Sequence, residues 1–424
     1  MSELALFGGN PVRNKTFKNK PYITEEEIEL VTKLMRDGQF SKFIGSPHEN
    51  VKELIEYTSK ELENLNMESS FLGGEWVRKF EAKWSELVDV EYSISVNSAT
   101  SGLITALNAI GIKGKKVLTS PISFTATVGA IKLAGGIPVF ADIDLETYCL
   151  SPESVYENIS WNLETVVPVH WCGNAGDFDD VLKICKIKHI IEDAAQVSGT
   201  KYKGKYLGTF GTAGVYSFNE PKNISTGEGG MIVTQDKDIA KKCRLIRNHG
   251  ENLIEGVPIP NLFGYNFRMV ELLAAIGYKQ IDKLEKLNKI RRDNFNHLLY
   301  EFDEWGINEE LLPQTITVDN YAAYTASFRW VNKKISRDSF ADALRAEGIP
   351  VATGIPKLLS ENTDDSFKLH NAKKLQKEYI GFFQMGYPNT MEDMHDITLA
   401  IDKILANVNE LKNYNPSTNF IIGR

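Results

Sequence analysis

The sequence predicts an α/β fold with a large domain and a smaller α+β C-terminal domain. From about Tyr92 to Thr234, short β-branched runs alternate with helical patterns, which is typical of a mostly parallel sheet sandwiched by helices. After about Phe295 the alternation gives way to an α+β mixture. We expect three parts: an N-terminal arm with an inserted helical segment over 1–85, the large domain over 86–285, and the small domain over 286–424.

The large domain is expected to contain a seven-stranded sheet. The candidate strands are Tyr92–Val96, Lys116–Ser120, Pro138–Asp142, Thr165–His170, His189–Glu192, Ala213–Phe218 and Gly230–Thr234. Between the first two, Leu103, Ala106, Leu107 and Ile110 are spaced at i, i+3, i+4 and i+7, so they predict a helix with one apolar face.

Helical patterns flank this region. Asn50–Leu65 predicts an amphipathic helix within an unusual segment from about Ser41 to Gly74, with one face made of Val51, Leu54, Ile55, Thr58 and Leu62. The stretch MVELLAAIGYKQIDKLEKL predicts one long helix from Met269 past Leu287 that joins the two domains. Farther on, YTASFRWV predicts a strand, RDSFADALRAEG a helix ending at Gly348, and EDMHDITLAIDKIL a late helix.

The composition excludes several classes of protein. The net charge is −8 and the lysines and arginines are dispersed, so a basic face for nucleic acid or anionic lipid is not expected as the main function. Any phosphate must therefore be bound locally. Cys149, Cys172, Cys185 and Cys243 lack metal-ligand spacing and are expected to be buried free thiols, with no metal site. The sequence shows neither a signal-peptide pattern nor a membrane-length apolar run, so we expect a cytoplasmic protein.

The first motif with chemical meaning is VNSATSGL, residues 96–103. A strand ends, small hydroxylic residues follow, and a helix begins. Free N–H groups at a helix start bind phosphate well, and Ser98 and Thr100 add hydroxyl donors. An ordinary helix N-cap is the alternative, since Ser and Thr are favoured there for structural reasons.

The second motif is HIIEDAAQ, residues 189–196. Its strand ends in Glu192 and Asp193, at the sheet edge where open α/β folds place ligands. A carboxylate there could keep a ring nitrogen protonated, as a pyridinium cofactor requires. An aspartate that caps the next helix is the alternative.

The third motif is VYSFNEPKNISTGEGGMIVT, residues 215–234. A lysine in a tight, partly buried loop can lose enough solvation to become a nucleophile. The alternatives are a solvated surface lysine and, for the glycine-rich stretch Gly227–Gly230, a hairpin turn. The glycine spacing matches neither a P-loop nor a dinucleotide-binding fingerprint.

In this order the motifs resemble those of the DegT/StrS-type sugar aminotransferases, a family of pyridoxal-phosphate enzymes with the aspartate-aminotransferase fold (fold type I). The resemblance covers nearly the whole chain. It includes LFGGNPVR, GGEWVRKFEAKW, NSATSGLITALNAIGI, PISFTATVGAI, GGIPVFADID, VPVHWCGN, IIEDAAQ, YSFNEPKNISTGEGG, GYNFRMVELLAAIGYKQIDKL and the FADALRAEGI region. The pairing of EDAAQ with SF…K…TGEGG is highly specific.

The resemblance implies the roles of four residues around the cofactor ring. Lys222 is similar to the Schiff-base lysine, which also shuttles the proton. Asp193 is similar to the partner of the pyridinium nitrogen, and Gln196 to the residue against the phenolic oxygen. Phe124 is similar to the aromatic that stacks on the ring. The large domain would thus be the cofactor-binding domain.

The resemblance also implies a phosphate site, to which Ser98 is added as a hydroxyl donor. Ala99, Thr100 and Ser217 are similar to the family's phosphate ligands. Asn266 is similar to the residue that reaches the phosphate from the neighbouring subunit, which implies a homodimer with shared active sites.

The reaction implied is transfer of an amino group from L-glutamate to a keto-sugar, which is expected to be nucleotide-linked, in the biosynthesis of cell-surface glycans, such as lipopolysaccharide O-antigen, or of natural-product sugars. Members that dehydrate keto-sugars carry His where this chain has Lys222, which argues against that branch. A cyclitol or other polyol ketone stays open as acceptor. A regulatory protein without turnover would be favoured by loss of Lys222 or Asp193, and both are present.

Three departures from the family leave the sugar itself unpredicted. The segment from about Ser41 to Gly74 is longer than is typical, Ser198 stands where many members have His, and TGIPKLLS replaces an aromatic-proline segment.

Overall fold

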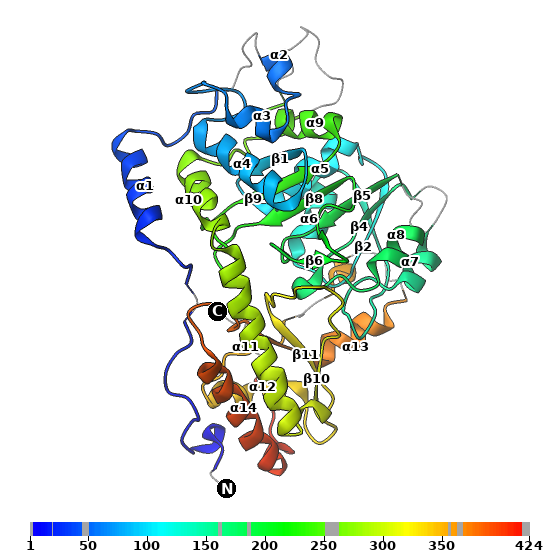
Figure 1. Cartoon of the computed structure of the whole chain (residues 1–424). Helices are drawn as coiled ribbons and strands as arrows, with labels where there is room; N and C mark the ends of the chain where they lie inside the picture. Colours follow the sequence, from blue (N-terminus) through cyan, green and yellow to red (C-terminus); the bar gives the residue numbers. More distant parts are fainter. Residues whose placement is uncertain are drawn as a thin grey trace.

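The computed structural model describes residues 3–18, 20–44, 51–159, 163–184, 188–250, 263–354, 358–362 and 368–417. Figure 1 shows a large sheet in the upper part of the view and a smaller sheet below it. The long helix α11 (Leu284–Glu304) runs from the first to the second.

The large sheet has the seven strands that the sequence predicts, with ends that differ by at most three residues. They are β1 (Tyr92–Val96), β2 (Lys116–Thr119), β3 (Ile137–Phe140), β4 (Thr165–Val167), β5 (His189–Asp193), β8 (Ala213–Ser217) and β9 (Gly230–Thr234). The strand order is β1-β9-β8-β5-β4-β2-β3. From β8 to β3 the pairs are parallel, whereas β9 is antiparallel to both of its neighbours.

Both faces of this sheet are covered, because alternate side chains enter two different cores. On β9, Met231 and Val233 join one core, while Ile232 joins the other. The first core is packed by α4 (Glu75–Val88), α7 (Pro152–Asn158), α8 (Phe178–Ile184) and α10 (Glu271–Ile281). The second is packed by α5 (Ala99–Ile110), α6 (Thr125–Leu133) and α9 (Lys237–Arg247).

Two helices that the sequence predicts as continuous are each divided in two, so both predictions were wrong on this point. The helix expected from Met269 past Leu287 is broken between α10 and α11 at Asp282 and Lys283, and α11 then continues to Glu304. The side chains at the break are anchored elsewhere, since Asp282 pairs with Lys83 and Lys283 pairs with Glu27.

The helix expected over Asn50–Leu65 is two short helices, α2 (Val51–Leu54) and α3 (Ser59–Glu63). Thr58, which the periodicity placed on the apolar face, is instead the N-cap of α3: Glu61 N–H donates to its side chain, and its own N–H donates to the Glu61 carboxylate at 2.7 Å. Leu54, Ile55 and Leu62 are buried as expected. Residues 45–50 of this segment lie outside the described residues.

The smaller sheet is antiparallel, in the order β10-β11-β12. Its strands are β10 (Leu311–Pro313), β11 (Ala326–Trp330) and β12 (Tyr379–Phe382). Residues of α11, α12 (Arg337–Ala346) and α14 (Met391–Ala406) form its core, together with Leu4 from the N-terminal arm. The expected strand and both expected helices are therefore confirmed, whereas the domain boundaries stay a prediction.

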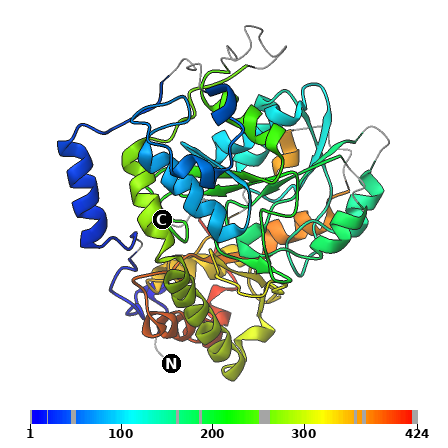
Figure 2. The ribbon, with the colours of Figure 1, turned by 45° about the horizontal axis from the view of Figure 1, so that its top comes forward.

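Three smaller pieces complete the fold. The helix α1 (Glu25–Arg36) lies beside α10 in both views (Figures 1 and 2), with Glu26 paired to Lys279. The short strands β6 (Lys201–Tyr202) and β7 (Lys205–Tyr206) form a hairpin. The helix α13 (His370–Glu378) packs against residues that follow β2 and β3.

Cys149, Cys172 and Cys243 are buried free thiols, as expected, and Cys185 lies outside the described residues. Within the part of the chain that the structure describes, no helix is both long and apolar enough to cross a membrane.

Candidate active site

The predicted residues come from one edge of the large sheet. In the strand register, Gly230 at the start of β9 lies between Val96 at the end of β1 and Ser217 at the end of β8. Asp193, the last residue of β5, lies on the other side of β8. Adjacent strands are about 4.8 Å apart, so the loops that leave β1, β8 and β5 begin within roughly 15 Å of one another.

Asp193 is a buried carboxylate with 6% exposure. Its Oδ2 accepts a hydrogen bond from Thr127 Oγ1 at 2.7 Å, and its Oδ1 accepts one from the Ala195 N–H at 3.3 Å. Burial raises the pKa of Asp193, while the bond from Thr127 and the charge of Lys222 lower it. Turns rather than a helix follow Asp193, which contradicts the alternative that it is a helix cap.

Glu192, the other carboxylate of the motif, is structural. It pairs with His170 Nε2 at 2.9 Å and accepts hydrogen bonds from the N–H groups of Gly208, Phe210 and Gly211, each at 2.7 Å. These partners use both of its oxygens. Only Asp193 is left to act on a ligand.

Phe124 lies immediately before α6, one helical turn from Thr127. Its carbonyl accepts a hydrogen bond from the Thr127 N–H at 3.2 Å, so the residue that holds Asp193 also fixes the backbone at Phe124. The ring of Phe124 is 68% exposed. An aromatic face left open beside a buried carboxylate is suited to stacking on a flat ring.

The start of α5 has the features of an anion site. Ser98 is its N-cap, since its Oγ accepts a hydrogen bond from the Ser101 N–H at 3.1 Å, and the structural alternative therefore accounts for this side chain. Among the described residues, the N–H groups of Ala99 and Thr100 have no hydrogen-bond partner. Two free N–H groups at the positive end of a helix can bind a phosphate.

Gly230 keeps this anion site open. A Cβ added at position 230 would lie 2.6 Å from Ala99 N, which would cover that amide. The hydroxyl of Ser217 is on the opposite side of Gly230 in the register and, within the described part of the chain, makes only one long contact, at 3.4 Å from Asn219 N. These groups fit the phosphate of the expected cofactor.

Lys222 lies in the loop between the antiparallel strands β8 and β9. The glycine-rich stretch Gly227–Gly230 therefore does close a hairpin, which was the structural alternative for it. The loop is closed by backbone hydrogen bonds from Thr226 to Phe218 and from Lys222 to Asn219, both at 2.9 Å. The next residue, Asn223, donates to Asn288 Oδ1 of α11 at 2.7 Å. The backbone at Lys222 is therefore held from both sides.

Lys222 is a half-buried residue rather than a solvated surface lysine. Its Nζ lies 4.1 Å from the ring centroid of Tyr324. Burial lowers the pKa of Lys222 to about 8, although the charge of Asp193 acts to raise it. The two residues are close enough for each to affect the pKa of the other.

Gln196 is hydrogen-bonded to Cys172, a residue that the sequence did not single out for the site. The Oε1 atom of Gln196 accepts a hydrogen bond from the Cys172 N–H at 2.6 Å. The backbone of Cys172 is left-handed, with φ of 55°, and burial raises the pKa of its thiol to about 11. The thiol is therefore neutral, and the turn at Cys172 positions Gln196.

Asn266 is exposed, and its Oδ1 accepts a hydrogen bond from Arg268 Nε at 2.8 Å. The carbonyl of the next residue, Phe267, accepts one from the Asn97 N–H at 2.9 Å, so this segment lies beside the loop between β1 and α5. The role expected for Asn266 across a subunit interface stays a prediction.

The sequence did not identify Thr127, Tyr324 or Arg291 as site residues. Thr127 could have been found, because it stands one turn after Phe124 in the same SFTAT motif. Tyr324 and Arg291 belong to the smaller sheet region and to α11, and no local pattern brings them to Lys222.

Comparison with known proteins identifies the family to which this chain is similar. A model described as the DegT/DnrJ/EryC1/StrS aminotransferase family matches residues 52–378. The chain is 31% identical over 370 residues to an uncharacterised protein of Methanocaldococcus jannaschii, covering 81% of this chain and 95% of that protein. It is 35% identical over 243 residues to the GDP-perosamine synthase of Escherichia coli O157:H7, covering 56% of this chain and 66% of that enzyme.

Solved structures agree with the fold. The aminotransferase from Psychrobacter cryohalolentis is 25% identical, with a TM-score of 0.78 over 92% of this chain and 99% of that one. DesI, solved in the presence of its TDP-sugar product, is 23% identical, with a TM-score of 0.80 over 96% of this chain and 97% of that one.

Proposed function

The chain belongs to the DegT/DnrJ/EryC1/StrS aminotransferase family, and we propose that it moves an amino group from L-glutamate to the keto group of a nucleotide-linked sugar. It is an aminotransferase of fold type I that depends on pyridoxal phosphate. The acceptor is proposed from the activities named for relatives, which include a GDP-perosamine synthase, a spore coat polysaccharide biosynthesis protein of Bacillus subtilis, and DesI with its TDP-sugar product. Synthesis of cell-surface glycans or natural-product sugars is the setting we propose, in the cytoplasm.

The observation that carries the proposal is that the half-buried side chain of Lys222 and the buried carboxylate of Asp193 come from one edge of the sheet, close enough for each charge to shift the pKa of the other. Bound pyridoxal phosphate supplies an aldehyde that reacts with amines and a pyridinium ring that withdraws electrons. Lys222 would hold the aldehyde carbon, Asp193 the ring nitrogen, and Gln196 the phenolic oxygen. Phe124 would cover the ring, and the phosphate would be bound by Ala99, Thr100 and Ser217, with Ser98 capping the helix that presents these amides.

Lys222 is suited to carry the proton. With a pKa of about 8, about a quarter of its amine is neutral at pH 7.5, compared with about one part in a thousand for an ordinary lysine. A neutral amine can take the proton from Cα of the donor, and a pKa near the working pH lets the same nitrogen return it.

Arg291 on α11 supports glutamate as the amino donor. Its guanidinium is 7% exposed, and burial lowers its pKa to about 10. Nη1 donates to the carbonyl of Ala323 at 3.1 Å, but no carboxylate of the described chain lies within ion-pair distance of Arg291. Arg291 and Lys222 line the same narrow pocket, so a carboxylate of glutamate would supply the missing partner.

The proposal also includes a homodimer, in which Asn266 completes the phosphate site of the partner subunit. The exposed position of Asn266 beside the loop that starts α5 is consistent with a residue placed at an interface.

The test follows the cofactor by absorbance. Wild-type protein with pyridoxal phosphate should show the visible band of lysine-bound cofactor, and borohydride should fix the cofactor to the chain. Lys222→Ala should abolish the fixation, while the control Lys205→Ala, at an exposed hairpin position, should not. Glutamate should then bleach the band and release 2-oxoglutarate, and Arg291→Met should raise the KM for glutamate more than that for alanine.

The acceptor is tested by offering the bleached enzyme keto-sugar nucleotides and keto-cyclitols. Return of the visible band with a keto-sugar nucleotide, together with its aminated product, supports the proposal. Return with a keto-cyclitol alone would replace the acceptor. No spectral change with glutamate would refute the donor, and protein that stays colourless with excess cofactor would refute the reaction.

A further inference from the structure

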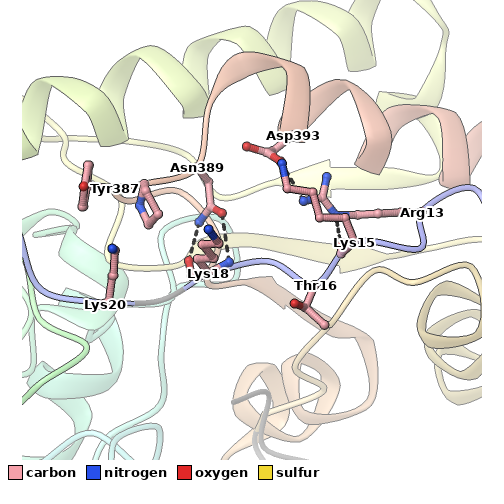
Figure 3. Close-up of a pocket in the computed structure, with 9 residues that line it drawn as sticks. Arg13, Lys15, Thr16, Lys18, Lys20, Tyr387, Asn389 and Asp393 are labelled. Atoms are coloured by element: carbon pink, nitrogen blue, oxygen red, sulfur yellow. Dashed lines mark hydrogen bonds and ion pairs between the residues drawn. The ribbon is translucent and has the colours of Figure 1, made fainter.

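A basic cavity lies between the N-terminal arm and the region around the smaller sheet. Its volume is about 230 Å³. It is lined by Arg13, Lys15, Thr16, Lys18 and Lys20 of the arm and by Tyr387, Pro388, Asn389 and Asp393 at and before the start of α14. In Figure 3, Lys20 and Tyr387 stand at one end of this cavity, and Arg13 and Asp393 at the other.

The charges of this cavity are unbalanced. Arg13 is neutralised, because its two terminal nitrogens pair with Asp393 at 2.7 Å and Asp396 at 2.5 Å. Lys15, Lys18 and Lys20 have no carboxylate within ion-pair distance among the described residues. On a chain with a net charge of −8, three uncompensated lysines around one cavity form a local anion site.

Exposed lysines are usually only solvated charges, but the backbone that bears these is held in place. Asn389 accepts a hydrogen bond from the Lys18 N–H at 3.3 Å and donates to the Lys18 carbonyl at 2.9 Å (Figure 3). Upstream, the carboxylate of Glu347 accepts from the N–H groups of Ala5 at 2.9 Å and Val12 at 3.0 Å. The arm is therefore held upstream of the lysines and at Lys18 itself, and less order has to be imposed when a ligand binds.

The cavity borders the pocket that contains Lys222. Lys20 and Tyr387 line the cavity, and they also line the narrow pocket that contains Lys222 and Arg291. A ligand with a carbonyl carbon near Lys222 and an anionic group farther along would place the anion against the arm.

We propose that Lys15, Lys18 and Lys20 bind the diphosphate of the acceptor, whose keto-sugar then lies toward Lys222. This inference rests on the proposed function, because it requires a nucleotide-linked acceptor. Lysine is a strong point-charge partner of phosphate, and three lysines match the charge of a diphosphate better than the free N–H groups of the helix start, which the cofactor phosphate would occupy.

The test measures binding rather than turnover. Isothermal titration of the cofactor-loaded protein uses inorganic pyrophosphate, UDP, GDP and dTDP as probes, each at low and high salt. The variant Lys15→Ala/Lys18→Ala/Lys20→Ala should weaken binding of pyrophosphate and of the preferred nucleotide at least a hundredfold, and most of the salt dependence should disappear with it. The matched control Lys333→Ala/Lys334→Ala/Lys412→Ala removes equal charge from exposed positions elsewhere and should change binding less than twofold. Thermal melting checks that both variants fold.

Three results would overturn the inference. If the arm variant binds a nucleoside diphosphate as tightly as wild type, the diphosphate is held elsewhere, and the proposed function still stands. If the control variant loses as much affinity as the arm variant, the effect is one of overall charge. If wild-type protein binds none of the probes and aminates only a ketone without a nucleotide, the acceptor proposal fails, and this inference fails with it.

Discussion

The pKa of Lys222 gives a quantitative test of the site in the absence of cofactor. Burial lowers this pKa to about 8 from an ordinary value of 10.5. At pH 8, half of the Lys222 amine is then neutral, against about one part in 300 for an ordinary lysine, so its reactivity per accessible amine should be about 150-fold higher. The expected midpoint of its reactivity profile is near pH 8.

The assay is competitive acetylation from pH 6 to 11. A trace of acetic anhydride is divided between cofactor-free protein and free N-α-acetyl-lysine in the same tube, and the peptide that contains Lys222 is quantified by mass spectrometry. The ratio to the reference amine removes the pH dependence of the reagent. A profile for Lys222 that still rises with the reference up to pH 10 would refute the burial argument.

The variant Asp193→Asn tests the coupling between the two residues. The charge of Asp193 favours the protonated form of Lys222, so its removal should move the midpoint lower by about one pH unit or more. The control Glu153→Gln removes a carboxylate at an exposed position on α7 and should leave the midpoint in place. A midpoint that rises in Asp193→Asn would show that desolvation and charge have been assigned in the wrong direction.

Four further results are expected. Between about pH 8 and 10.5 the unfolded chain keeps the proton that Lys222 has lost in the folded protein, so the free energy of unfolding of the cofactor-free protein should rise with pH in this window. In urea unfolding, Lys222→Met should remove that slope and increase the free energy of unfolding at pH 7 by up to about 3 kcal/mol. Thr127→Val removes the 2.7 Å hydrogen bond to the buried carboxylate and should speed cofactor release about tenfold, followed by absorbance after dilution. Gly230→Ala should cost about 1–3 kcal/mol and weaken cofactor binding, because its Cβ would meet a backbone nitrogen at 2.6 Å, whereas the control Gly129→Ala, with open space around it on α6, should be neutral or slightly stabilising. Asn266→Ala should weaken cofactor retention in a dimer measured by light scattering, and a stable monomer that keeps full cofactor would contradict the shared site.

The large sheet could be predicted closely because its signals are local. Each strand is a short β-branched run whose side chains enter cores on both faces, so the runs appear in the sequence as apolar blocks separated by helical spacing. Asp193 and Lys222 could be predicted as a pair because the sheet edge collects residues that follow successive strands. The role of each still came from a resemblance rather than from the residues alone.

What could not be predicted depends on partners that are distant in the sequence. The break between α10 and α11 occurs where Asp282 and Lys283 pair with Lys83 and Glu27, and neither partner is visible in the helix itself. Arg291 is one cation in a helix rich in charges, and only its burial against the smaller sheet region distinguishes it. Thr58 fits the apolar period of one helix until its capping bond to Glu61 starts another.

The charges of the site explain why a cofactor belongs there. Burial raises the pKa of Asp193 and lowers that of Lys222, so in the free protein each group is held in a state that costs free energy, and their mutual attraction offsets only part of this cost. A protonated ring nitrogen against Asp193 would give the carboxylate a partner, and reaction of the Lys222 amine with an aldehyde requires the neutral form that burial already favours. The N–H groups of Ala99 and Thr100 similarly have no partner among the residues that the structure describes, and a phosphate would provide one. Three groups at one sheet edge that would each gain a partner thus match the three ends of a single small molecule, and this match is a stronger argument for the cofactor than any one residue.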